Sequence, residues 1–100
     1  MMLGDMLGAA RAAAPDLERW LAEDATLDHR LRAVALAEER SLSSCVRAAV
    51  ASFAHEASDE DWATLASRLR DSDDPGGICL LVMLDRWLER SSALPRGVHP

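Results

Sequence analysis

Apolar residues recur every three or four positions along almost the whole of this 100-residue chain. That spacing places them on one face of an α-helix, whereas a half-buried strand requires strict alternation. No run of four or more residues alternates convincingly. Prolines and short serine-rich or aspartate-rich segments interrupt the pattern, as is typical of helix ends. The sequence therefore predicts an all-α fold, a compact bundle of five to six short helices.

The breaks in the first half of the chain predict three helices. The first begins near Leu3 and ends at Pro15, because proline cannot continue the backbone hydrogen bonds. Pro15 is also expected at the first position of a short second helix. A third helix is expected to run to about Arg40, with Thr26 or Asp28 as its N-cap.

The second half predicts three more helices. A helix over about Leu42–His55 has the cleanest apolar stripe, and we expect it to be the central one. Ser58, followed by three acidic residues, is a strong N-cap for a fifth helix. The sixth is expected over about Pro75–Ser91, with Asp74 as its N-cap. The stripe of the fourth helix consists of Leu42, Cys45, Val46, Ala49, Val50 and Phe53.

Length and composition predict one domain in a reducing compartment. A chain that is 49% hydrophobic can bury one core, expected over residues 1–92, with a flexible tail over 93–100. Cys45 and Cys79 lack CxxC spacing, which favours two reduced thiols and a cytoplasmic location. The longest apolar run, Ile78–Leu84, is far shorter than the about 20 residues that cross a membrane, so no membrane association is expected.

The charge balance argues against direct nucleic-acid binding. Seventeen acidic residues outnumber eleven arginines, and the chain has no lysine, which gives a net charge of −6. Because nucleic acid is itself strongly negative, such a surface repels it unless the arginines cluster, and they do not cluster in the sequence.

One segment partly matches a calcium loop of the EF-hand type. Asp71, Asp73 and Gly76 occupy positions one, three and six of that pattern, but position five is Pro75 and position twelve is Val82. Because position twelve must supply a bidentate carboxylate, the match fails there. The aspartates are better explained as complements of the positive end of a helix dipole.

Other candidate sites also lack a necessary group. The segment "HEASD", His55–Asp59, resembles the HExxH zinc-protease pattern, but Ser58 is expected to start a new helix and separate the two ligands. A phosphate at Gly76 and Gly77 would be repelled by neighbouring aspartates. We therefore expect neither metal nor cofactor.

The possible nucleophiles lie together in one short segment. Ser43, Ser44 and Cys45 have no general base at a helical spacing that faces them. A non-catalytic protein is therefore expected, and an enzyme or small metal-binding protein is the alternative if a site assembles only in three dimensions.

The segment "LDHRLRAVALAEERSLSSCVRAAVASF", Leu27–Phe53, resembles the two-helix part of ribbon-helix-helix transcription regulators and antitoxins. The resemblance rests on Leu31 and Leu36, a serine turn, and then Val46 and later apolar residues. It implies a DNA-reading strand before the first helix, which in that family is basic, whereas the preceding "LAEDATLDH" here is acidic.

The leading hypothesis is a small acidic module that binds a partner protein as an adaptor, stabiliser or inhibitor, with homodimerisation expected. One alternative is an inhibitor whose acidic segments "DEDW" and "DSDD" occupy a nucleic-acid-binding surface of the partner. The first and last helices look too apolar to cover one another, and two glycines in a first turn suggest close approach of another backbone. The predicted partner-binding residues are Leu3, Leu7, Gly76, Gly77, Leu80, Leu84, Trp87 and Leu88.

Overall fold

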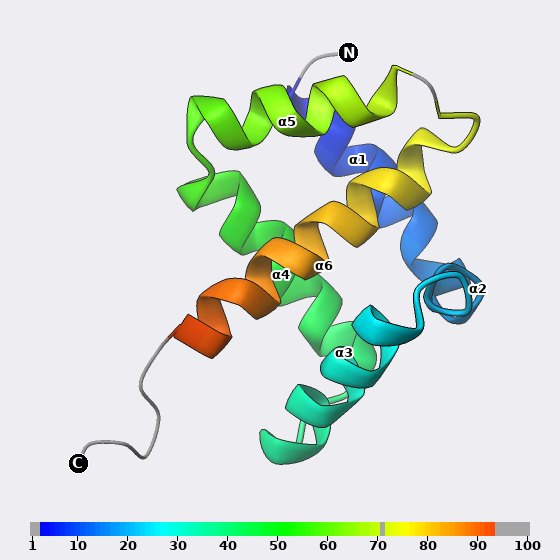
Figure 1. Ribbon diagram of the computed structural model, residues 1–100, viewed down its shortest axis with the longest axis vertical. Helices are drawn as coiled ribbons and strands as arrows, with labels where there is room; N and C mark the ends of the chain where they lie inside the picture. Colours follow the sequence, from blue (N-terminus) through cyan, green and yellow to red (C-terminus); the bar gives the residue numbers. More distant parts are fainter. Residues whose placement is uncertain (1–2, 71, 94–100) are drawn as a thin grey trace.

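The computed structural model describes residues 3–70 and 72–93, with side-chain surroundings for 4–70 and 72–90. These residues form helices and no strand, which confirms the all-α bundle (Figure 1). The expected tail falls almost entirely on residues 94–100, which lie outside the described part. The elements in chain order are α1 (Leu3–Ala13), the 3-10 turn η1 (Ala14–Asp16), α2 (Leu17–Leu21), α3 (Ala25–Ala37), α4 (Leu42–Glu56), α5 (Asp59–Leu69) and α6 (Pro75–Ala93).

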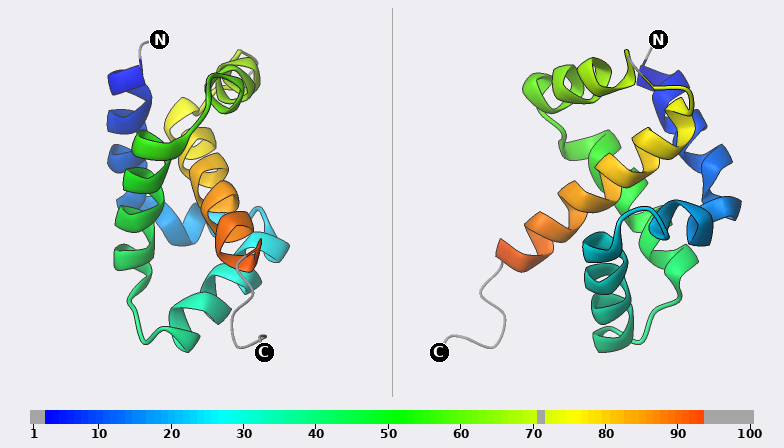
Figure 2. Two further views of the ribbon diagram at one scale, coloured as in Figure 1. Left: turned by 90° about the vertical axis from the view of Figure 1, so that its left-hand side faces the viewer. Right: turned by 45° about the vertical axis from the view of Figure 1, so that its right-hand side comes forward.

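The central helix is α6, and the prediction that α4 has this place was wrong. Every other α-helix packs against α6, which crosses α4 and α1 as one long diagonal (Figures 1 and 2). A helix that is surrounded by neighbours needs apolar residues on nearly all sides, whereas α4 is covered mainly on one face. Buried residues of α6 include Cys79, Leu80, Met83, Leu84 and Leu88, and Leu81, Val82 and Trp87 are partly buried.

The two glycines of α6 allow close packing within this chain. A Cβ atom on Gly76 would lie 2.8 Å from the carbonyl oxygen of Ala9 in α1. One on Gly77 would lie 2.6 Å from two ring atoms of Trp20 in α2. Close approach of another backbone is therefore confirmed at Gly76, whereas the group close to Gly77 is the Trp20 side chain, and both neighbours belong to the same chain.

Local sequence signals fix the starts of α4 and α5. The Ser58 hydroxyl accepts a hydrogen bond from the Asp61 backbone N–H at 3.1 Å, and the Asp61 carboxylate accepts one from the Ser58 backbone N–H at 2.9 Å. This reciprocal capping box confirms the predicted start of α5. In the same way, Ser41 Oγ accepts from the Ser44 backbone N–H at 3.0 Å at the start of α4.

The start of α3 differs from the prediction. Its N-cap is Asp24, whose Oδ1 accepts from the Leu27 backbone N–H at 3.0 Å, instead of Thr26 or Asp28. Asp28 lies one turn inside the helix, where its carboxylate accepts from Arg32 Nε at 2.7 Å. Several residues of this segment can cap a helix, and in the structure Asp24 does so while Asp28 pairs with Arg32.

The end of α3 contains a residue in a left-handed conformation. Glu39 has φ of 53°, and the backbone N–H groups of Glu39 and Arg40 donate to the carbonyls of Leu36 and Ala35 at 3.2 and 2.9 Å. These two bonds form a Schellman motif, in which glycine is the usual residue at the position of Glu39. A side chain there costs about 1–2 kcal/mol of backbone strain.

Ion pairs join α6 to three of its neighbours. Asp85 accepts from Arg30 of α3 at 3.1 Å, Arg90 pairs with Glu56 of α4 at 3.2 Å, and Arg86 lies 3.6 Å from Asp61 of α5. These pairs are partly exposed, so each contributes little to the free energy of unfolding. The core residues therefore supply most of the stability.

The capping box predicts a pH dependence of stability. The hydrogen bond from the Ser58 backbone N–H, together with the charge of Arg86, lowers the pKa of Asp61 below its ordinary 3.8. A lowered folded-state pKa stabilises the fold above the unfolded pKa, and this stabilisation is lost as the pH falls through the folded pKa. Asp61→Asn keeps a hydrogen-bond acceptor but removes the negative charge from the first turn, so it should reduce the free energy of unfolding by about 0.3–1 kcal/mol near neutral pH. In urea melts this difference should shrink steadily below pH 3.8, and a difference that is the same at both ends of the pH range would contradict the assignment.

Candidate functional site

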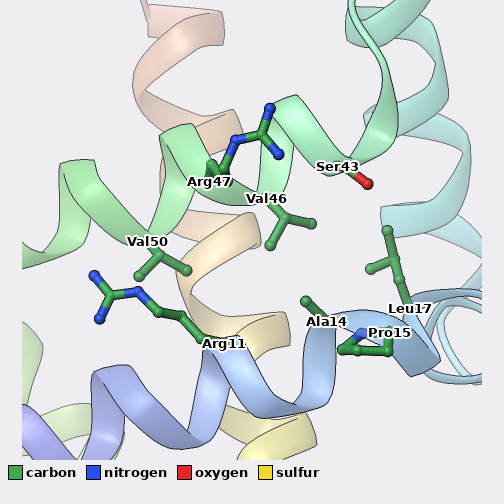
Figure 3. A pocket seen from close by; sticks show the side chains of 8 residues that line it. All are labelled: Arg11, Ala14, Pro15, Leu17, Ser43, Val46, Arg47 and Val50. Atoms are coloured by element: carbon green, nitrogen blue, oxygen red, sulfur yellow. The ribbon is translucent and has the colours of Figure 1, made fainter.

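A surface groove of about 490 Å³ lies between the α1–η1–α2 stretch and α4. We call it the arginine groove. One wall consists of Arg11, Ala14, Pro15 and Leu17, and the other of Ser43, Val46, Arg47 and Val50. Figure 3 shows the aliphatic side chains directed into the space between the two walls, with one arginine on each wall. A volume of this size is in the range of ordinary ligand pockets.

The floor of the arginine groove is the outer surface of the core. Leu17, Val46 and Val50 are 7%, 4% and 2% exposed, so packing inside the domain holds them in place. A site built on such fixed residues loses little conformational entropy when it is filled. The groove is therefore preformed for an apolar group.

The two arginines of the groove are exposed and form no ion pair within the described part of the chain, and none of the eight lining residues is acidic. Five other arginines do pair with carboxylates, namely Arg30, Arg32, Arg40, Arg86 and Arg90. In a chain with a net charge of −6, the groove is thus a local positive region beside apolar surface. Such a region favours a ligand that has both an apolar part and a carboxylate.

The groove offers little for catalysis. Ser43 supplies a hydroxyl, but none of the other lining residues is a His, Asp, Glu or Cys that could accept its proton. Both cysteines are free and buried elsewhere, and burial raises the pKa of the Cys45 and Cys79 thiols. Neither thiol is therefore activated as a nucleophile.

Most of the described residues predicted to bind a partner lie in this chain's own core or pack against it. Leu80 and Leu84 are fully buried and Leu88 is 1% exposed, so a partner has no access to them in this conformation. Gly76 and Gly77 contact α1 and α2, as described above. Leu7 and Trp87 are partly buried against the same core, and Arg40 lies 5.6 Å from the Trp87 ring. Leu3 begins α1, and its side chain lies outside the described part.

The inference that α6 has more apolar surface than this chain can cover was therefore wrong. Its wide apolar surface is covered by the other helices of the chain, because α6 is the central helix. The one large hydrophobic residue that the described part exposes is Leu36, at 82%, near the end of α3.

The acidic segments do not form one surface. Asp59 and Glu60 are exposed at the start of α5, and Asp73 and Asp74 are exposed after its end (Figure 1). The intervening helix separates them by roughly 16 Å, at about 1.5 Å per residue. Among the described residues, no group of three or more His, Cys, Asp and Glu side chains is placed to hold a metal ion.

The structure also locates the other motifs. His55 lies in the last turn of α4, and Ser58 begins a new helix, so the predicted break of the zinc-like segment is confirmed. Residues 21–31 contain the end of α2 and the start of α3, and no strand. The ribbon that a ribbon-helix-helix protein needs is therefore missing from that segment. No helix in the described part is long and apolar enough to span a membrane.

Comparison with known proteins gives no further assignment: no protein-family model, curated protein or solved structure matches this chain.

Sequence patterns did not reveal the arginine groove. Arg11 and Arg47 are distant in the sequence, and only the packing of α1 against α4 brings their walls together. The available signal was weak: each arginine lies beside an apolar stripe, next to Ala10 in one case and Val46 in the other. Many surface arginines have such neighbours, so the pattern alone does not distinguish a site.

Proposed function

We propose that this protein is a small non-catalytic module that binds a partner protein through the arginine groove. The observation that supports the proposal is the preformed apolar floor between Arg11 and Arg47, which form no ion pair within the described residues. The occupant that fits is an exposed segment with an aliphatic side chain next to a carboxylate. Two free buried thiols support a reducing, cytoplasmic setting for this module.

An apolar side chain and an acid contribute differently to such binding. Removing the aliphatic side chain of the ligand from water, by placing it in the groove, supplies most of the affinity, at roughly 25 cal/mol per Å² of apolar area. The carboxylate pairs with a guanidinium at the rim, which orients the segment and excludes basic partners. Binding should therefore weaken at high salt without disappearing.

A designed peptide pair tests the proposal. A fluorescent helical peptide with leucines along one face and glutamates beside them should bind, whereas its lysine counterpart should not. Replacing both Arg11 and Arg47 with alanine should weaken binding of the acidic peptide about tenfold, which corresponds to about 1.4 kcal/mol. Fluorescence anisotropy measures both affinities.

The matched control is Arg68→Ala together with Arg70→Ala, since both arginines are exposed and neither lines the groove. This double variant changes the net charge by the same amount, so its affinity for the acidic peptide should stay close to that of the original protein. Equal losses in the two double variants would show a nonspecific charge effect and contradict the proposal.

A further inference from the structure

The end of α3 has the features that the arginine groove requires of an occupant. Leu36 is 82% exposed, whereas the other large apolar side chains of the described part are buried or partly buried. Glu39, three residues after Leu36, is exposed and forms no ion pair with the described residues. We call these two residues the Leu36 knob.

Glu39 occupies its position against the local backbone preference. Its φ of 53° lies in the left-handed region, where glycine fits without strain. The Schellman bonds hold the Glu39 backbone at the end of α3, and the Glu39 side chain is exposed. A residue in a strained backbone conformation whose exposed side chain forms no ion pair with the described residues is a candidate for function.

We propose that the partner in the arginine groove is a second copy of this chain, with Leu36 of one copy on the apolar floor of the other and Glu39 paired with Arg47. This inference rests on the proposed function and names its partner. An aliphatic side chain meets an apolar groove, and an unpaired carboxylate meets an unpaired guanidinium, as judged from the described residues. The Leu36 knob and the arginine groove are therefore complementary both in charge and in polarity.

The positions of knob and groove allow a closed dimer. The end of α3 and the start of α4 flank the short connection over residues 38–41, and Ser43 and Arg47 belong to the first part of α4. The knob and one wall of the groove therefore lie at the same end of the molecule (Figure 1). Two copies related by a twofold axis can exchange knob for groove in both directions, and such a contact closes without forming a chain of molecules.

Sedimentation equilibrium tests the inference with variants that leave the core unchanged. The original protein should associate to a dimer between roughly 10 µM and 1 mM. Leu36→Glu should weaken dimerisation by at least about tenfold, because it places a carboxylate on the apolar floor. Glu39→Gly should also weaken dimerisation, because it removes the carboxylate that pairs with Arg47. It should raise the melting temperature, because glycine adopts the left-handed conformation without strain.

A charge exchange tests the pairing itself. Glu39→Arg alone places two arginines together, and Arg47→Glu alone places two glutamates together, so each variant should be monomeric. In an equal mixture, the introduced arginine of the first variant faces the introduced glutamate of the second. The unchanged Glu39 of the second variant likewise faces the unchanged Arg47 of the first. The mixture should therefore dimerise to within about threefold of the original association constant.

Three results would overturn this inference. They are a monomer throughout the concentration range for the original protein, unchanged dimerisation of Leu36→Glu, or no association in the mixture of charge variants. The acidic peptide distinguishes these outcomes from failure of the proposed function, because it is tested on the Leu36→Glu variant, whose groove remains intact. Peptide binding by a protein that does not dimerise would mean that the groove takes a different partner.

Discussion

Leu84→Ala should lower the free energy of unfolding by about 3–5 kcal/mol. Leu84 is fully buried in the middle of α6, the helix against which all other α-helices pack. Removing its terminal carbons forfeits their transfer free energy and leaves a cavity that the surrounding helices cannot fill without moving. Because a domain of this size has about 5–15 kcal/mol of stability in total, the variant should be partly or fully unfolded at physiological temperature. Thermal and urea unfolding followed by circular dichroism measure the effect.

The control for this prediction is Leu36→Ala, which makes the same chemical change at a residue that is 82% exposed. Its free energy of unfolding should change by less than about 0.5 kcal/mol. If Leu84→Ala were as stable as Leu36→Ala, then Leu84 would face solvent or would bind a partner, and the central position of α6 would be wrong. Partner binding is the role that the sequence pattern predicted for Leu84.

Two glycine-to-alanine substitutions should have opposite effects on stability. At Gly77 the new methyl group would overlap the Trp20 ring, with contacts of 2.6 Å to two of its atoms. Trp20 is itself only 8% exposed, so the rigid ring has little room to move, and the expected loss is about 1–3 kcal/mol. At Gly8 in α1 the methyl group would meet no atom within 4 Å, and the better helix propensity of alanine should add up to about 1 kcal/mol.

Differential scanning calorimetry of both variants measures the two effects under one set of conditions. The melting temperature should fall for Gly77→Ala and rise for Gly8→Ala. A rise for both variants would mean that helix propensity dominates at both positions and that α6 does not approach Trp20 as closely as the structure indicates.

Signals that act within one turn of helix were predicted well from the sequence. Ser58 with its acidic neighbours starts α5, α1 ends at Ala13 shortly before Pro15, and Pro75 begins α6, because capping and the geometry of proline depend on a few adjacent residues. Pro15 itself lies in the turn η1 instead of at the predicted first position of α2, which begins at Leu17. The N-cap of α3 was predicted wrongly, as Thr26 or Asp28, because Asp24, Thr26 and Asp28 can all cap a helix and the local sequence does not decide among them.

Features that depend on how helices pack were not predicted. The apolar residues of α6 have the pattern of either a central helix or a helix that binds a partner, and the order of helices in space decides between the two. Leu80, Leu84 and Leu88 were assigned to a partner for this reason, although they belong to the core. The arginine groove was not found because its walls come from distant parts of the chain, and neither wall is unusual alone.

The most direct test of the central claim is a map of backbone amide chemical shifts during titration with the acidic leucine-rich peptide. The measurement uses the ¹⁵N-labelled Leu36→Glu variant, so that self-association does not compete with peptide binding. We expect saturable shifts that are largest around Arg11, Ala14, Ser43 and Arg47, with none from the lysine counterpart. Shifts concentrated on α5, or spread evenly over the exposed arginines, would contradict the claim that this groove is the binding site.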